Sequence, residues 1–260
     1  MRRADPLVVS AGVLAAANVL NNRVARRWAP LTSAAATAAL LAVARREGLG
    51  WAELGFGRAR RGAVVGGALA AGVAAVYAAG VALPRTRPLF HDERALGLSR
   101  ARVLEEALVQ VPFGTVLLEE VGFRGVLPAL FGRVLPAGAA AAASAGLFGL
   151  WHVLPALDMA RANLTLGRLA AGESPDLEHA ASAAPAKAGD VGTARLVAGT
   201  VLSTSAAGMA FHELRRRSGL LAPSLLHLAT NSLGYAAARL AARIGPGRTG
   251  QEPGPGSASP

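Results

Sequence analysis

Long apolar stretches without charged residues recur along the chain. The clearest one, residues 62–84, lies between Arg61 and Arg85 and contains no charged side chain. An α-helix rises about 1.5 Å per residue, so a stretch of this length crosses the roughly 30 Å hydrocarbon core of a bilayer. The pattern predicts membrane-spanning helices here and at comparable uncharged stretches, which cover residues 6–22, 28–44, 134–157, 196–212 and 218–238.

A further apolar stretch, residues 103–118, is shorter than the others. It carries Glu105 and Glu106 near its start and runs directly into Glu119 and Glu120. Several stretches consist of Ala and Gly rather than Leu and Ile, which weakens the apolar signal of each span. We therefore predict an all-α fold, a polytopic membrane helix bundle of about seven spans.

Small residues can let membrane helices approach closely. Gly62 and Gly66 form one such pair on a predicted span. An Ala-rich composition could also produce this spacing without any helix contact there.

Composition excludes several classes of protein. Hydrophobic residues make up 52% of the chain and charged residues 17%, and there is no cysteine. The lack of cysteine excludes a disulfide framework, a thiolate zinc site and a cysteine nucleophile. The net charge of +11 would be typical of a nucleic-acid-binding protein, but the charges are too sparse for such a surface. We expect no nucleic-acid partner and assign the arginines to turns at anionic lipid head groups.

Three clusters of arginine lie between the predicted spans. With seven spans, the second and third clusters share one side of the membrane with the N-terminus, and the first lies opposite. Because basic loops favour the cytoplasm, we expect the N-terminus inside. The clusters are Arg23, Arg26 and Arg27; Arg45, Arg46, Arg58, Arg60 and Arg61; and Arg215, Arg216 and Arg217.

Ionisable residues inside a span cost about 3 kcal/mol each, which makes each one a candidate functional residue. Glu120 and Arg124 are one helical turn apart, in the order that favours an ion pair. Glu119 is turned by about 100° from Glu120 and so can face another side. This spacing predicts one structural carboxylate and one that is free to act.

Two other spans supply histidine. His152 lies deep in the stretch 134–157, while His227 and Asn231 are one turn apart on the last span. Taken alone, His152 could equally be a hydrogen-bonded residue of the bundle. Glutamate and histidine can together remove a proton from water, and histidine and asparagine can donate hydrogen bonds to an oxyanion. The set predicts hydrolysis of an amide bond.

The patterns of other hydrolases and of ATP-driven proteins are missing from the sequence. No His-Glu-x-x-His zinc motif and no Gly-x-Ser-x-Gly elbow occurs. His212-Glu213 is followed by Leu214 and three arginines, which is typical of a membrane interface. There is no glycine-rich phosphate loop with its lysine.

Three motifs in order resemble the CPBP family of intramembrane proteases, also called the CAAX-protease and bacteriocin-processing or abortive-infection family. That family's pattern is Glu-Glu-x-x-x-Arg, then Phe-x-x-x-His, then His-x-x-x-Asn. The resemblance covers roughly residues 105–235. The chain carries the three motifs on successive predicted spans as Glu119-Glu120 with Arg124, Phe148 with His152, and His227 with Asn231.

The resemblance implies a glutamate-dependent endopeptidase whose active site lies in an intramembrane catalytic cavity. It implies Glu119 as the general base, His152 as the residue that orients or deprotonates the water, and His227 with Asn231 as the oxyanion donors. Residues with supporting roles would be Glu120 and Arg124, which hold the helix geometry, and Phe148, which packs.

The domain division follows from these assignments. We expect N-terminal membrane spans in residues 1–102 and a CPBP-like catalytic membrane domain in residues 103–243. Gly, Pro, Ser and acidic residues over 158–194 predict a long extramembrane loop, and the Gly/Pro/Ser-rich stretch 244–260 predicts a disordered tail.

Two rival functions stay open. The same glutamate and histidines could hold zinc in a metal-dependent protease, although we favour an enzyme without a cofactor. Alternatively, the chain is a non-catalytic membrane binding or immunity protein. Arginine-rich, lysine-poor composition is typical of a high-GC bacterium, where prenylated CAAX proteins are not expected. We therefore expect a multi-pass protein of a bacterial plasma membrane, acting on a membrane-associated peptide or protein.

Overall fold

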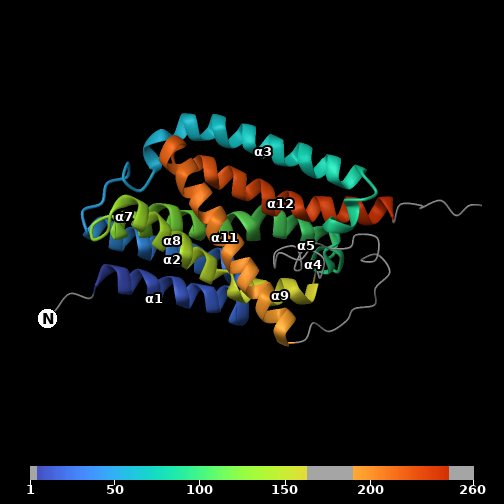
Figure 1. Cartoon of the computed structure of the whole chain (residues 1–260), viewed down its shortest axis with the longest axis horizontal. Coiled ribbons are helices and arrows are strands. Elements are labelled where there is room, and N and C mark those ends of the chain that lie inside the picture. Colours follow the sequence, from blue (N-terminus) through green and yellow to red (C-terminus); the bar gives the residue numbers. More distant parts are fainter. Residues whose placement is uncertain (1–4, 163–189, 246–260) are drawn as a thin grey trace, which may run out of the picture.

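The structure is a computed structural model, and it describes residues 5–162 and 190–245. Throughout these residues the regular elements are helices, and no strand is present among them. Figure 1 shows α3 (Ala59–Ala82) and α12 (Leu221–Ile244) running side by side, while α11 (Asp190–Ser218) crosses the bundle obliquely. The start of α1 (Pro6–Val19) and the start of α3 lie at the same end.

Each of the seven predicted spans falls on a helix. The long elements are α1 (Pro6–Val19) with its continuation η1 (Leu20–Val24), α2 (Ala29–Arg46), α3 (Ala59–Ala82), α8 (Ala137–Trp151), α9 (Val153–Ala162), α11 (Asp190–Ser218) and α12 (Leu221–Ile244). The seventh predicted span lies in a helical run built from α5 (Arg100–Glu105), η5 (Glu106–Val116), α6 (Leu117–Glu120), η6 (Val121–Val126) and α7 (Leu127–Phe131). Shorter turns are η2 (Arg26–Trp28), η3 (Phe56–Arg58), η4 (Arg87–Phe90) and α4 (Glu93–Leu96).

Within the described residues, three helices are long and apolar enough to cross a membrane. They cover Pro6–Val24, Phe56–Ala82 and Ala137–Asp158. The count of about seven spans stays a prediction. Composition alone is a poor guide to which helices cross the membrane, because a polar side chain can be satisfied within its own helix. In α11 the hydroxyl of Thr204 donates a hydrogen bond to the carbonyl of Thr200 at 2.6 Å. A hydroxyl satisfied in this way is tolerated in an apolar environment.

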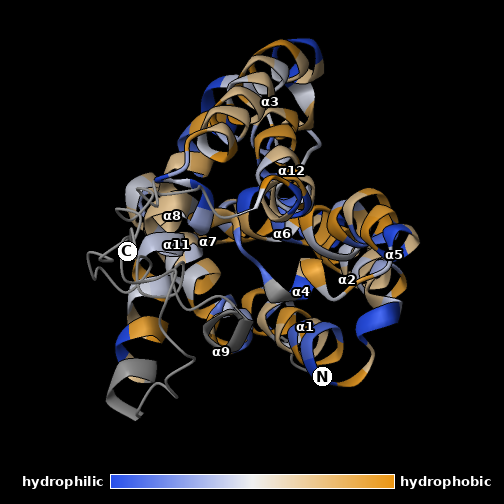
Figure 2. Cartoon of the chain, turned by 90° about the vertical axis from the view of Figure 1, so that its right-hand side faces the viewer, coloured by the Kyte–Doolittle hydropathy of each residue, from blue (hydrophilic) through white to orange (hydrophobic). Residues whose placement is uncertain are grey.

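The helix α3 lies at the edge of the bundle against α12 (Figure 2). Its outward side chains are apolar: Val64 is 68% exposed and Val76 is 66% exposed. An exposed apolar face of this kind suits contact with lipid, where the helix satisfies its own backbone hydrogen bonds. The exposed faces and the apolar helices support a location in the membrane.

The predicted small-residue contact is confirmed between α3 and α12. Gly62 and Gly66 are buried, and a Cβ atom on Gly66 would lie 2.9 Å from the Cα atom of Ala222. The two backbones therefore approach each other more closely than any side chain at Gly66 would allow.

Gly66→Leu is expected to push α3 away from α12 and to lower the free energy of unfolding by about 1–3 kcal/mol. Gly67→Leu is the matched control, because a Cβ atom on Gly67 meets nothing within 4 Å. Thermal unfolding of the two purified variants checks this, and equal melting temperatures would contradict the contact.

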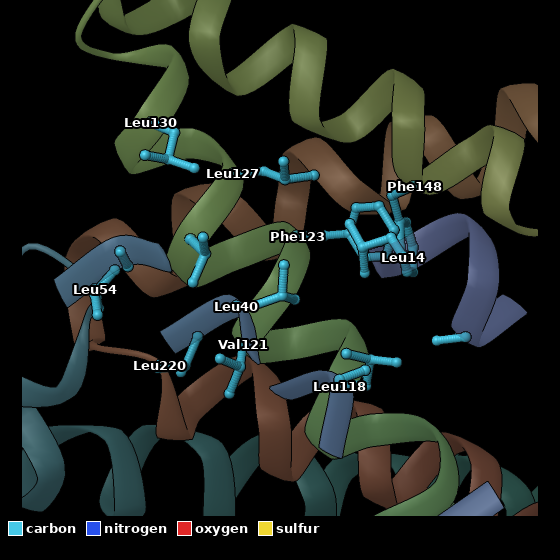
Figure 3. Close-up of a cluster of buried hydrophobic side chains, with 14 of the residues drawn as sticks. Leu14, Leu40, Leu54, Leu118, Val121, Phe123, Leu127, Leu130, Phe148 and Leu220 are labelled. Atoms are coloured by element: carbon cyan, nitrogen blue, oxygen red, sulfur yellow. The ribbon is translucent and has the colours of Figure 1, made fainter. Parts of the chain in front are cut away.

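One cluster of buried side chains joins the N-terminal helices to the later ones. Leu14 of α1 and Leu40 of α2 pack with Leu118, Phe123 and Phe148 (Figure 3). Full burial of one such large apolar side chain contributes about 1.5–3 kcal/mol to stability. The cluster fixes the helices that carry the two acidic residues and His152.

The diacid does not end its helix. Helical backbone continues from Arg100 to Phe131, and two of the five segments, η5 and η6, have the wider π-helical turn. Pro112 lies inside η5 and lacks a backbone N–H, which disturbs the regular α-helical bonding there. The sequence pattern of 103–118 therefore underestimated the length of this helix.

The predicted loop at 158–194 is wrong at both ends. The helix α9 extends to Ala162 and α11 begins at Asp190, while residues 163–189 lie outside the described residues. Asp158 belongs to α9 and pairs with Arg23 at 3.0 Å and Arg26 at 2.9 Å, which explains why the helix persists there. The predicted tail starts slightly later than expected, because Ile244 is still in α12; residues 246–260 are outside the described range.

The second and third arginine clusters meet at one end of the bundle. Arg58 donates hydrogen bonds to the carbonyls of Arg216 and Arg217, both at 3.0 Å. Gly219 has φ +82°, a left-handed conformation that allows the sharp turn from α11 into α12. The shared side of these two clusters agrees with the predicted topology, and its cytoplasmic orientation stays a prediction.

Candidate active site

Both acidic residues of the diacid are buried in the bundle. Glu119 is 4% exposed and Glu120 is 1% exposed, and both lie in α6, between the two π-helical segments. Buried carboxylates are stable only with hydrogen bonds or charge partners, so the partners of each one reveal its role.

Glu120 is bound by two basic side chains. Its Oε1 atom lies 2.8 Å from Nδ1 of His227 and 3.6 Å from Nη1 of Arg124. The expected ion pair with Arg124 one turn away is present. The imidazole of His227 reaches Glu120 from α12, so this carboxylate ties the diacid helix to the last helix.

Arg124 is held mainly by aromatic rings. The guanidinium carbon lies 3.7 Å from the ring centre of Phe148 and 5.0 Å from that of Phe211. Its N–H groups have no hydrogen-bond partner among the described residues, and the side chain is 1% exposed. A cation on an aromatic face is worth up to about 2 kcal/mol when desolvated. Phe148 therefore connects the second motif to the first by packing on the arginine.

Glu119 has one oxygen held and one unpaired. Its Oε1 atom accepts a hydrogen bond from Nε1 of Trp151 at 2.8 Å. Its Oε2 atom is buried without a hydrogen-bond partner in the described part of the chain and lies 3.7 Å from Nε2 of His227. Nδ1 of His227 thus faces Glu120, and Nε2 of the same ring faces Glu119.

The structure brings five of the predicted residues into one cluster: Glu119, Glu120, Arg124, Phe148 and His227. His152 lies at the break between α8 and α9, with Nδ1 2.8 Å from the carbonyl of Phe148 and its ring 4.5 Å from the ring of Phe148.

Asn231 lies on α12 one turn after His227. It is half-buried and has no polar partner among the residues the structure describes. The catalytic roles of Glu119, His152, His227 and Asn231 stay predictions.

An apolar cavity of about 390 Å³ adjoins the cluster on the Glu120 side. It lies between η5 and the start of α12, and Phe113, Leu117 and Leu225 are among its walls. Glu120 is the one charged residue among its described lining residues. A cavity of this chemistry suits an aliphatic or aromatic group.

A comparison with protein families matches the segment that holds this cluster. The family model described as "Type II CAAX prenyl endopeptidase Rce1-like" matches residues 106–233, from η5 to the middle of α12. The chain belongs to the CAAX-protease family. Membership of the CAAX-protease family supports an endopeptidase of this type acting in the membrane. No curated protein and no solved structure matches the chain.

The sequence analysis of this CAAX-protease-family chain did not predict two residues of the site. Trp151 immediately precedes His152, and a tryptophan in an apolar stretch needs an acceptor for its indole N–H. Phe211 precedes His212 and packs against both Arg124 and the ring of His227, at 5.6 Å between ring centres in the latter pair. The indole of Trp151 could have been flagged by that rule, whereas Phe211 carried no signal.

The donor groups around Glu119 do not form a ready metal site. In residues 5–162 and 190–245, no three His, Cys, Asp or Glu side chains lie together so that they could hold one ion. His227 uses Nδ1 on Glu120, and Nδ1 of His152 bonds a backbone carbonyl. Nε2 of both histidines stays free within the described residues, and zinc dependence stays an alternative to the metal-free mechanism.

Proposed function

We propose that this CAAX-protease-family protein is an intramembrane endopeptidase in which Glu119 activates the attacking water. The observation that carries the proposal is the difference between the partners of the two carboxylates: Oε1 of Glu120 is bound by His227 and lies near Arg124, while Oε1 of Glu119 accepts only the indole N–H of Trp151. Each carboxylate keeps one buried oxygen without a hydrogen bond within the described residues, and that of Glu119 lies 3.7 Å from Nε2 of His227. A general base needs an oxygen that is free to take a proton.

In the first step, a water molecule beside Oε2 of Glu119 attacks the carbonyl carbon of the scissile amide and gives its proton to that oxygen. His152 assists through Nε2, which is free to accept a hydrogen bond from the water because Nδ1 bonds the carbonyl of Phe148.

In the same step the carbonyl oxygen becomes an oxyanion. His227 donates to it through Nε2, while its Nδ1 atom lies 2.8 Å from Oε1 of Glu120 and fixes the ring. The side-chain amide of Asn231 donates the second hydrogen bond. In the last step the C–N bond breaks, and the leaving amine takes the proton back from Glu119.

The substrate is a membrane-associated peptide or protein with an apolar group near the scissile bond. The cavity beside Glu120 accepts that group, because its walls are apolar and Phe113, which is 53% exposed, leaves it open toward the outer face of the helices. The family description names prenyl endopeptidases. For this chain we favour an unprenylated bacterial substrate, because its arginine-rich composition is typical of a high-GC bacterium.

Cleavage of a membrane-peptide library by the protein in lipid nanodiscs tests the proposal. We expect cleavage beside an apolar residue, and we expect less than a twofold loss of rate with EDTA or a zinc-specific chelator. Inhibition by the chelator that added zinc reverses would support the metal-dependent alternative. Binding of peptides without any cleavage would support a non-catalytic binding protein.

A further inference from the structure

Trp151 contacts the diacid through its indole and the N-terminal helix α1 through its backbone carbonyl. We propose that Trp151 and Asn18 are positioning residues that hold Glu119 in its reactive orientation. The proposal rests on the proposed function, since it takes Glu119 as the general base. It also extends the functional unit beyond the family-matched segment 106–233, because Asn18 belongs to α1.

Trp151 fixes which oxygen of Glu119 is free. Its Nε1–H donates to Oε1 at 2.8 Å, and the indole is 7% exposed, so water does not compete for this bond. A carboxylate held at one oxygen cannot exchange its two oxygens by rotation. The bond therefore keeps Oε2 on the side of His227, where the water must lose its proton.

The indole is itself held in place. Its ring lies edge-on to Phe123, with 5.5 Å between ring centres. Trp151 ends α8, where the last carbonyls of a helix have no donor from the helix itself. Nδ2 of Asn18 donates to the carbonyl of Trp151 at 2.8 Å and supplies that missing donor.

A second asparagine orients Asn18. Nδ2 of Asn22 donates to Oδ1 of Asn18 at 2.8 Å, which leaves Nδ2 of Asn18 directed at Trp151. Three hydrogen bonds thus run from Asn22 through Asn18 and Trp151 to the base. The indole of Trp151 has one N–H group, and Glu119 accepts its hydrogen bond. Trp151 therefore acts through Glu119 and not by donating to the substrate.

The experiment uses the full chain with Trp28→Phe and Trp51→Phe, which leaves Trp151 as the one tryptophan. Trp28 is 63% exposed and Trp51 is 52% exposed, so we expect these changes to leave activity unchanged. Trp151 is then replaced by benzothienylalanine, which has sulfur in place of the N–H and nearly the same shape.

With an internally quenched membrane peptide as substrate, the analogue is expected to lower kcat by about 10–100-fold and to change KM by less than twofold. Asn18→Ala is expected to lower kcat by roughly 3–10-fold. Melting temperatures should stay within a few degrees of the parent. Unchanged kcat in the analogue, or a loss of kcat that parallels a loss of folded protein, would overturn the proposal.

A spectroscopic measurement tests the contact without any substrate. In the single-tryptophan protein, the ultraviolet resonance Raman band that reports hydrogen bonding of the indole N–H should shift in Glu119→Leu, which has no acceptor, and stay in place in Glu213→Gln. An unshifted band in Glu119→Leu would overturn the contact.

The same variants separate failure of this inference from failure of the proposed function. Full activity of Glu119→Gln would overturn the proposed function itself. An inactive Glu119→Gln protein beside a fully active Trp151 analogue would overturn only the role of Trp151.

Discussion

Glu119→Gln is expected to lower kcat by about 10³–10⁴-fold while KM stays close to that of the parent protein. The amide has the shape of the carboxylate but cannot take a proton from water, so the general-base contribution is lost. Its oxygen can still accept the hydrogen bond of Trp151, so we expect the fold to be retained. Initial rates on a cleaved membrane peptide, with thermal unfolding of the same samples, check both parts.

Glu213→Gln is the matched control for this prediction. Hydrogen bonds from Arg216 and Arg217 lower the pKa of Glu213 to about 2, so this carboxylate is charged at every practical assay pH. It lies on α11 beside the arginine cluster, away from the diacid helix. We expect unchanged kinetics in this variant, and cleavage at the parent rate by Glu119→Gln would exclude the glutamate mechanism.

Gly149→Ala is expected to separate α8 from α11 and to lower the free energy of unfolding by about 3 kcal/mol. A Cβ atom on Gly149 would lie 2.5 Å from the backbone carbonyl oxygen of Val201 and would also overlap the hydroxyl of Ser205. The backbone oxygen cannot turn aside, so the helices must move apart. His152 is less than one turn further along the chain, and a displacement of about 1 Å there is expected to cost roughly 10²-fold in activity.

Gly146→Ala tests whether this effect is specific. Gly146 lies on the same helix, and a Cβ atom there meets nothing within 4 Å. Alanine inside a helix is favoured over glycine by about 0.5–1 kcal/mol, so this variant is expected to be as stable as the parent or slightly more so. Melting temperatures and peptide cleavage of the two variants decide the matter, and equal values would refute the close approach of α8 and α11.

Local spacing predicted much of the cluster correctly. Glu120 and Arg124 are one turn apart on one helix, and simple helix geometry places them together. Their meeting with His227 could not come from spacing, because it joins helices whose residues are 107 positions apart. The order of the three motifs supplied that information instead.

Hydropathy was a weaker guide to helix ends. It placed the end of one apolar stretch at Leu118, because Glu119 and Glu120 follow there. The helix continues inside the bundle, where His227 and Arg124 lie against one oxygen of Glu120 and Trp151 binds one oxygen of Glu119. The polar ends of the predicted loop 158–194 were misread for a similar reason, since Asp158 pairs with arginines of the first cluster.

The bond between Glu120 and His227 also bears on how the protein is made. The diacid leaves the ribosome long before α12, so Glu120 lacks its partner His227 until the last helix is made. A charged group in lipid is costly, which favours insertion of the diacid helix together with α12. A product truncated before α12 would therefore expose Glu120 without this partner.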